Sequence, residues 1–313
     1  MSNYVKIATV GPRPPEVGLQ TKPQDLTDYM ITHWQQEFAQ ILPDKPDLIV
    51  VPEVCDRPAD WPPDEFFRYY KVRGVQVREF FARTARENSC YMVYSASRQA
   101  EDGKWYNSSV ILDRKGKTAG IYNKNHLVAA NEASCGFLYG QEASLIECDF
   151  GRVGCAVCFD LNFDQLRLKY ASVRPDLLIF SSVYHGGDLV QGYWAYSCRC
   201  HFVGAVAGFP SQIRNPFGQV LASSTNYRDY AVATVNLDCC LAHYDGNWDK
   251  FKALKAEYGP QVDIHDPAYV GSVLISSLTQ NKSAVQMAKE FEVELLDDYF
   301  ARSLKHRNSA ITS

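Results

Sequence analysis

Hydrophobic positions in the first part of the chain alternate between short continuous runs and helix-like spacing. Val5–Val10 and 46–54 (PDLIVVPEV) are apolar runs typical of buried strands. Between these runs, large apolar residues recur at steps of three and four and predict an amphipathic helix: Leu26, Met30, Trp34, Phe38 and Ile41. The chain therefore begins with a strand, a helix and a second strand.

The alternation continues and then starts again near residue 151. The next elements predicted in the first part are a helix over 77–85, a strand over 90–96, and a hairpin over 107–122 that turns at Lys115-Gly116. The second part then predicts, in order, strand 151–159, helix 163–170, strand 174–183, a helix from Leu189, strand 202–208 and hairpin 213–223.

Two local similarities indicate that the two parts are related. PDLIVV (46–51) resembles PDLLIF (175–180), and ILDRKGK (111–117) resembles IRNPFGQ (213–219), in the same order. Repeated units of strands with helices between them predict two halves folded alike. We therefore expect an α/β fold in which two β sheets lie between two layers of helices.

The C-terminal part follows a different pattern. After a polar linker, 284–306 has helical spacing and includes the segment KEFEVELLDDYFARSLKHR. We divide the chain into one α/β domain over 1–275 and an extension over 276–313. The extension is expected to form a helical arm that packs on the domain or on a second subunit.

Composition narrows the class of protein. Hydrophobic residues are 46% and charged residues 22%, the net charge is −4, and no basic block or long apolar window occurs, so we expect neither a nucleic-acid nor a membrane partner. The N-terminus does not read as a signal peptide, and the ten cysteines are expected to be reduced thiols of a cytoplasmic protein. Cys198, Cys200 and His201 lie close together, but zinc sites usually need two well-spaced ligand pairs, so no metal is expected.

Three predicted strand ends carry unusual residues. Glu53 ends an apolar strand directly after Pro52, Lys124 follows the first hairpin, and Cys158 ends the run GCAVCF. Each has an ordinary interpretation when taken singly: an ion-pair partner, a solvated charge and a small core residue. Taken together at the ends of strands, where open α/β folds present functional groups, they indicate a reactive site.

The motifs around these residues resemble the nitrilase, or carbon–nitrogen hydrolase, superfamily. The resemblance rests on Pro52-Glu53, on Y-x-K-x-H-L at 122–127 and on G-x-x-x-C-[FY]-D at 154–160. It spans about residues 4–240 and includes Asn107 and the P-F-G-Q of the second hairpin. It implies a four-layer αββα sandwich that pairs into homodimers or higher oligomers.

The resemblance also implies a catalytic triad of Glu53, Lys124 and Cys158. The thiol would attack an amide carbonyl, with Glu53 as general base. The pKa of Glu53 is expected to be raised, because the residue ends an apolar strand. Lys124 and the backbone N–H of Phe159 would stabilise the oxyanion. The thioester would then be hydrolysed by water, with no metal or organic cofactor. Glu132 is the candidate for positioning the lysine or a substrate amine.

Further residues around the predicted nucleophile are expected to support the turn or to line the pocket. Asp160 is expected to anchor a sharp, exposed turn behind Cys158 by accepting backbone N–H bonds. Asn162 stands where many relatives have arginine; it is a candidate for substrate binding and hints at uncharged amide substrates. Tyr184 and His185, in the loop after the next strand, are candidates for lining the pocket.

The predicted function is hydrolysis of a small linear amide or an N-carbamoyl compound, with release of ammonia or an amine. Three alternatives stay open. The same triad could cleave a nitrile through a thioimidate, the chain could be a non-catalytic scaffold of this fold, or its ten thiols could serve metal or redox sensing.

Overall fold

A computed structural model describes residues 1–59, 61–183 and 187–311 of the chain. These residues form two compact units, Val5–Thr234 and a smaller one made of Met1–Tyr4 with Val235–Ser313. The division falls at residue 235, ahead of the boundary at 275 that the sequence predicted. The reason is that the strands after residue 238 form a sheet of their own.

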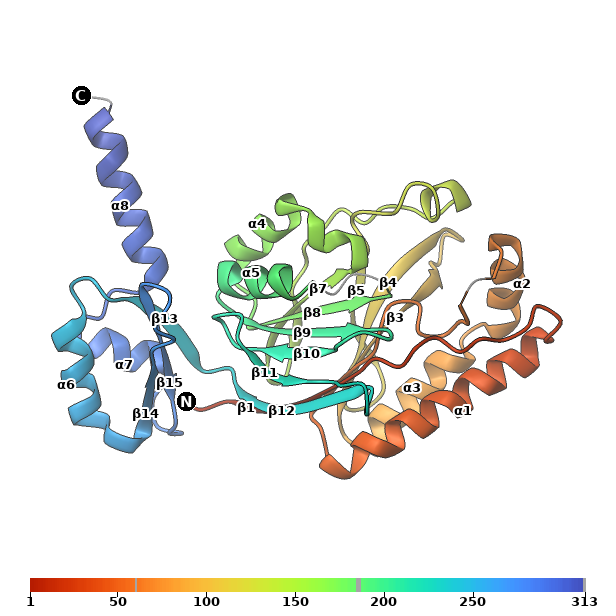
Figure 1. The fold of residues 1–313 in the computed structure, drawn as a ribbon, viewed down its shortest axis with the longest axis horizontal. Helices are drawn as coiled ribbons and strands as arrows, with labels where there is room; N and C mark the ends of the chain where they lie inside the picture. The colour runs from red at the N-terminus through yellow and green to blue at the C-terminus, as the bar shows by residue number, and fades with distance from the viewer. Residues whose placement is uncertain (60, 184–186, 312–313) are drawn as a thin grey trace. The chain divides into compact units, whose positions relative to one another are not determined.

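The larger unit contains two mixed six-stranded sheets (Figure 1). In spatial order, the first sheet consists of β12 (Tyr230–Asn236), β1 (Tyr4–Val10), β2 (Leu48–Val50), β3 (Tyr91–Gln99), β4 (Trp105–Leu112) and β5 (Thr118–Asn123). The second consists of β11 (Val220–Ser223), β10 (Gln212–Arg214), β9 (His201–Val206), β8 (Leu177–Ser182), β7 (Gly151–Val157) and β6 (Ile146–Cys148).

The two sheets repeat one topology. β1, β2 and β3 are parallel and continue into the antiparallel hairpin β4–β5, just as β7, β8 and β9 continue into β10–β11. One further strand closes the opposite edge of each sheet, β12 beside β1 and β6 beside β7. The similar segments PDLIVV and PDLLIF occupy equivalent strands, β2 and β8. The internal duplication predicted from the sequence is therefore confirmed.

Helices cover the outer face of each sheet (Figure 1). The helices of this unit are α1 (Pro23–Ile41), α2 (Pro63–Arg73), α3 (Gln76–Glu87), α4 (Asp164–Val173) and α5 (Asp188–Cys198). The predicted stripe of α1 is buried against β1, β2 and β3 in one hydrophobic cluster. On the other sheet, the Tyr170 hydroxyl of α4 donates to the carbonyl of Cys155 at 2.6 Å. The predicted α/β sandwich is thus confirmed.

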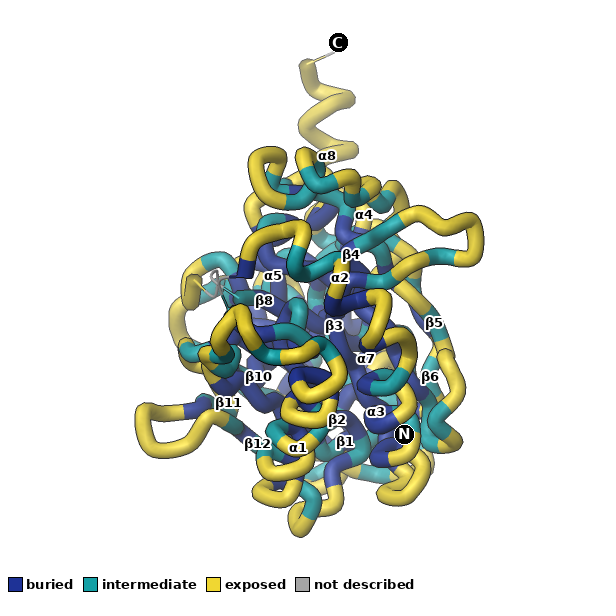
Figure 2. The backbone as a smooth tube through the Cα atoms, turned by 90° about the vertical axis from the view of Figure 1, so that its right-hand side faces the viewer, coloured by how far each residue is buried: buried dark blue, intermediate teal, exposed yellow. Residues whose placement is uncertain are grey.

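The central strands β2, β8 and β9 are buried on both faces, which explains their continuous apolar runs. Figure 2 shows strands such as β3 and β8 in the buried interior and much of the helical surface exposed. Where the sheets face each other, hydroxyl groups tie them together: Thr9 donates to the carbonyl of Gly204 at 2.9 Å and Ser181 to that of Val51 at 3.0 Å. The second of these bonds fixes Val51, two residues before Glu53, against the other sheet.

The smaller unit has a core of its own. Its antiparallel sheet is formed by β13 (Cys239–His243), β15 (Ser272–Ser277) and β14 (Val262–His265). Helices α6 (Trp248–Tyr258) and α7 (Ala284–Glu290) pack on it through Phe251, Leu254 and Met287. The predicted helical segment 284–306 is two helices, because Glu292 adopts a φ of 52° and ends α7 before α8 (Leu296–Ile311) begins.

Candidate active site

Three strand ends of the larger unit meet at one cavity of about 470 Å³. Glu53 follows β2, Lys124 follows β5 and Cys158 follows β7. All three line the cavity, together with Asn107 of β4 and Glu132 of the loop after β5. Four chain segments far apart in sequence therefore present a carboxylate, an ammonium group and a thiol to the same space.

Lys124 lies between two carboxylates. Its Nζ is 2.8 Å from Oε1 of Glu53 and 2.8 Å from Oε2 of Glu132. The lysine side chain is only 1% exposed and that of Glu53 6%, so these charges are largely removed from solvent. A buried ammonium group needs such partners, because an unpaired charge in the interior is very costly.

Asn107 joins the two glutamates on their other side. Its Nδ2 donates to Oε1 of Glu53 and to Oε1 of Glu132, each at 2.7 Å. The backbone N–H of Val128 donates to Oε2 of Glu132 at 2.9 Å. The sequence indicated Asn107 only as part of a resemblance, but in the structure it fixes the orientation of both carboxylates.

The electrostatics of the cluster favour an ionised pair beside a neutral thiol. Burial alone pushes the pKa of Glu53 upward, but the charge of Lys124 and hydrogen bonds from Lys124, Asn107 and Cys158 outweigh burial and lower it. Burial pushes the pKa of Lys124 downward, but the charges of Glu53, Glu132 and Cys158 raise it above its ordinary value. The raised Glu53 pKa expected from its apolar strand is therefore wrong, because that expectation ignored the adjacent cation.

The pKa of the Cys158 thiol is raised, in contrast to that of Glu53. Burial and the charge of Glu53 raise the pKa of Cys158 to about 11, although Lys124 and a hydrogen bond with Ser182 partly offset them. The resting nucleophile is therefore protonated at neutral pH. Its proton can leave only when the adjacent carboxylate takes it.

Cys158 occupies a sharp turn at the end of β7. Its φ is 45°, a left-handed conformation that is uncommon for a residue other than glycine. The turn continues as a short 3-10 helix over Cys158–Asn162. The predicted turn is present, but Cys158 is only 5% exposed and faces the cavity, so the expected exposed elbow is corrected to a buried one. Strain of this kind gathers at functional sites.

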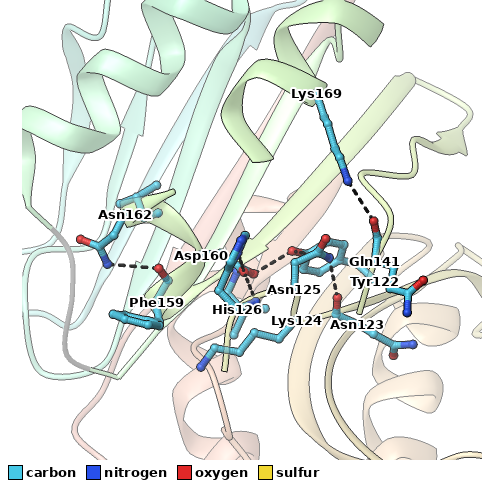
Figure 3. Close-up of polar contacts among 12 residues, drawn as sticks. Tyr122, Asn123, Lys124, Asn125, His126, Gln141, Phe159, Asp160, Asn162 and Lys169 are labelled. Carbon is cyan, nitrogen blue, oxygen red and sulfur yellow. Dashed lines mark hydrogen bonds and ion pairs between the residues drawn. The ribbon is translucent and has the colours of Figure 1, made fainter. Parts of the chain in front are cut away.

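Asp160 braces this turn from behind (Figure 3). Its Oδ2 accepts from the backbone N–H of Val157 at 3.0 Å and from the Tyr122 hydroxyl at 2.7 Å. Its Oδ1 accepts from the backbone N–H of His126 at 2.8 Å and contacts the ring Nδ1 at 2.9 Å. The carboxylate thereby links the Cys158 turn to both sides of Lys124.

Comparison with known proteins assigns the family. The sequence model of the carbon–nitrogen hydrolase family matches residues 6–238. The chain belongs to this family. Omega-amidase NIT2 from Danio rerio is 22% identical over 215 residues, which are 61% of this chain and 76% of that relative.

Two further matches are also distant in sequence. Hydrolase C26A3.11 from Schizosaccharomyces pombe is 21% identical over 149 residues, covering 44% of this chain and 45% of the relative, less than half of its length. The crystal structure of the C. elegans NitFhit protein matches with a TM-score of 0.66 and 17% identity, covering 83% of this chain and 65% of that protein. The likeness in structure concerns the fold.

Four further residues were predicted for the site, and the structure describes two of them, Phe159 and Asn162. Phe159 follows Cys158 in the first turn of the 3-10 helix, where backbone N–H groups have no acceptor within the helix. Asn162 is not among the lining residues; its side chain is exposed and donates to the carbonyl of Phe159 at 3.1 Å (Figure 3). Its predicted contact with substrate is therefore corrected, because it lies at the outer end of the turn. Tyr184 and His185 lie outside the described residues.

Sequence reasoning missed one wall of the cavity. This wall is formed by Arg57, in the loop after Glu53, and by aromatic residues mostly from α2: Trp61, Phe66, Phe67, Tyr70 and Phe137. The spacing of the aromatic residues at 66, 67 and 70 indicates one face of a helix. Neither a metal cluster of three ligands nor a helix suited to crossing a bilayer occurs in the described part of the chain.

Replacement of Asp160 by asparagine is expected to weaken both the fold and the site. One carboxylate oxygen would become an NH₂ group facing donors, which leaves buried donors unsatisfied at about 1–3 kcal/mol. Urea unfolding would measure this loss. The matched control is Asp164→Asn, since that side chain is 71% exposed and forms an ion pair with Arg167. Equal losses in the two variants would contradict the bracing role.

Proposed function

We propose that this carbon–nitrogen hydrolase cleaves a C–N bond outside peptide chains, in a small linear amide or N-carbamoyl compound, through a thioester on Cys158. The observation that carries the proposal is Lys124, held 2.8 Å from both Glu53 and Glu132 in the cavity that Cys158 lines. An ionised carboxylate beside a protonated thiol suits general-base activation of a nucleophile. The omega-amidase relative supports the amide class.

In the first step, Glu53 takes the thiol proton while the sulfur attacks the amide carbonyl. Lys124 and Asn107 both donate to Oε1 of Glu53, so the proposal assigns Oε2 as the proton acceptor. Lys124 and the backbone N–H of Phe159 stabilise the negative charge that develops on the carbonyl oxygen. Glu53 then gives its proton to the leaving nitrogen, and ammonia or an amine departs.

In the second step, water hydrolyses the thioester. Glu53 takes a proton from water as the water attacks, and the departing sulfur recovers that proton. Glu132 holds Lys124 in place through both steps, with Asn107 and Val128 fixing its carboxylate. We therefore treat Glu132 and Asn107 as positioning residues, and Glu53, Lys124 and Cys158 as the catalytic ones.

The proposed function is tested by a screen for ammonia release. Small amides, N-carbamoyl amino acids and the nitriles matched to each amide would be compared at equal concentration with the purified full chain. Preferential turnover of amides or carbamoyl compounds supports the proposal. Preferential turnover of the nitriles would replace it with nitrilase activity, and no turnover of any class would indicate a scaffold.

The activity is expected to be flat through neutral pH and to fall only in acid. Glu53 must be ionised to act as base, and its pKa is lowered from the ordinary value of 4.5. The acid limb of kcat/KM should therefore lie below pH 4.5, with activity lost as the pH falls through the Glu53 pKa. A pH series on one amide, with circular dichroism to follow folding, measures this. An acid limb centred near pH 6 or 7 would contradict it.

Pairing of the chain into a homodimer, and packing of the C-terminal residues 276–313 on a second subunit, stay predictions. Light scattering on the full chain measures the mass in solution and would test the first of them.

A further inference from the structure

Arg57 lines the cavity, and within the described residues its guanidinium forms no ion pair. The charged residues lining the cavity within the described part of the chain are Glu53, Lys124, Glu132 and Arg57, and the first three form one ion-pair cluster. The guanidinium of Arg57 lies over the ring of Phe66, with Cζ 4.0 Å from the ring centroid. Its Nε is buried and has no hydrogen-bond partner among the described residues. Protein atoms cover this nitrogen, so a ligand in the cavity would meet the other nitrogens of the half-buried guanidinium.

The loop that carries Arg57 is held firmly. The backbone N–H of Cys55 donates to the carbonyl of Ser95 at 3.1 Å, and the indole N–H of Trp34 donates to the carbonyl of Cys55 at 2.7 Å. The hydroxyl of Tyr69 donates to the carbonyl of Asp56 at 2.6 Å. The guanidinium is therefore attached to a braced backbone next to Glu53, which suits a preorganised binding group.

The nearest acidic residue along the chain does not neutralise Arg57 alone. Asp56 lies close enough for the charge of Arg57 to act on its pKa, but its Oδ2 is bonded by the buried guanidinium of Arg73. Arg73 also donates to the carbonyl of Ser97 at 2.9 Å. Asp56 thus shares its charge between two arginines, and Arg57 keeps positive charge to offer to the cavity.

The remainder of this wall is aromatic. The rings of Trp61 and Phe66 stack at 6.3 Å between centroids and those of Phe66 and Tyr70 at 6.1 Å. Phe137 closes the wall against Phe67, with the ring centroids 5.7 Å apart. A cation that lines a cavity and lies over an aromatic ring is a suitable receptor for a carboxylate attached to an apolar group.

We propose that the amide substrate carries a carboxylate at the end away from the scissile bond, and that Arg57 binds this carboxylate. The proposal rests on the proposed function and narrows its substrate class. It also replaces the uncharged substrates that Asn162 suggested, since Asn162 does not line the cavity. Arg57 therefore determines specificity, and Cys158 with Glu53 and Lys124 performs the chemistry.

The test compares anionic and neutral amides of equal length. The anionic set is the half-amides of succinic, glutaric and adipic acids, and the neutral set has a methyl group in place of each carboxylate. In the unmodified chain, kcat/KM should be higher for at least one half-amide than for its neutral partner. Arg57→Gln should reduce that ratio by about 10- to 100-fold, the range for a hydrogen bond to a charged group. Arg57→Lys should reduce it less, because the charge stays and the planar fork is lost.

The matched control is Arg68→Gln on α2, whose side chain is 67% exposed and pairs with Glu65. This variant should keep the ratio of the unmodified chain. A preference for the neutral amides, or an equal loss on both sets in Arg57→Gln, overturns the carboxylate proposal and leaves the amidase proposal standing.

If neither set is hydrolysed, the amidase proposal fails, and calorimetric binding of the same half-amides still decides the role of Arg57. Binding that weakens about 10-fold or more in Arg57→Gln supports the carboxylate site. Binding unaffected by the substitution, or no binding at all, overturns it.

Discussion

Replacement of Cys158 by alanine is expected to lower the ammonia release of the chain by about 10⁵- to 10⁶-fold, the size of effect seen when a hydrolase loses its nucleophile. The reason is that no other group in the cluster can form the acyl intermediate: Glu53 and Lys124 are bonded to each other, and Glu132 is bonded to Lys124. Stability should change little, since Cys158 lines a cavity and its loss leaves no buried charge unpaired. Ammonia release and urea unfolding measure the two effects.

Cys155 provides the matched control, because it lies on β7 three residues before Cys158, is fully buried and is not among the residues that line the cavity. Cys155→Ala should lose about 1 kcal/mol of stability, from one buried group, and keep its ammonia release.

Iodoacetamide labelling gives an independent measurement. Since the pKa of Cys158 is raised to about 11, its labelling should be slow at pH 7 and accelerate as the pH rises. Turnover that survives in Cys158→Ala would overturn the thioester mechanism.

The main elements of the larger unit could be predicted from the sequence because they leave either a continuous apolar run or a regular apolar stripe. Strands such as β2 and β8 are buried on both faces, and α1 buries a regular stripe, so both leave clear patterns. The smaller unit does not. Two of its strands are short and partly exposed: β13 buries only Leu241 and Ala242, and β14 only Val262. Such segments cannot be told from a polar linker by periodicity.

The same distinction applies to the site. Glu53, Lys124 and Cys158 could be predicted because each ends a recognisable strand. Their ionisation could not be predicted, since it depends on distances between segments far apart in sequence: the ammonium of Lys124, 2.8 Å from Glu53, reverses the effect of burial on the Glu53 pKa. The position of Arg57 on the cavity wall is likewise a property of the assembled fold, and a loop arginine in a sequence is usually a solvated surface charge.

Replacement of Lys124 by methionine is expected to damage both the activity and the fold. Methionine keeps an unbranched apolar stem but removes the ammonium group that lies between Glu53 and Glu132. Two carboxylates would then face each other without a cation, which costs about 3–5 kcal/mol when one partner of a buried pair is lost. Ammonia release should also fall by about 10²- to 10³-fold at least, because an oxyanion donor is lost.

The pH dependence of this loss identifies its cause. In the variant, burial and mutual repulsion raise the pKa of the paired carboxyls above their unfolded values. Their ionisation then opposes folding, so stability is retained below the unfolded pKa and is lost as the pH rises through the folded one. Urea unfolding should therefore show a larger deficit at pH 7.5 than at pH 5. Lys169→Met is the control, since Lys169 is exposed and donates to the carbonyl of Gln141 at 3.0 Å (Figure 3). A deficit in Lys124→Met that is equal at both pH values would mean that Lys124 stabilises the fold by packing and not by charge.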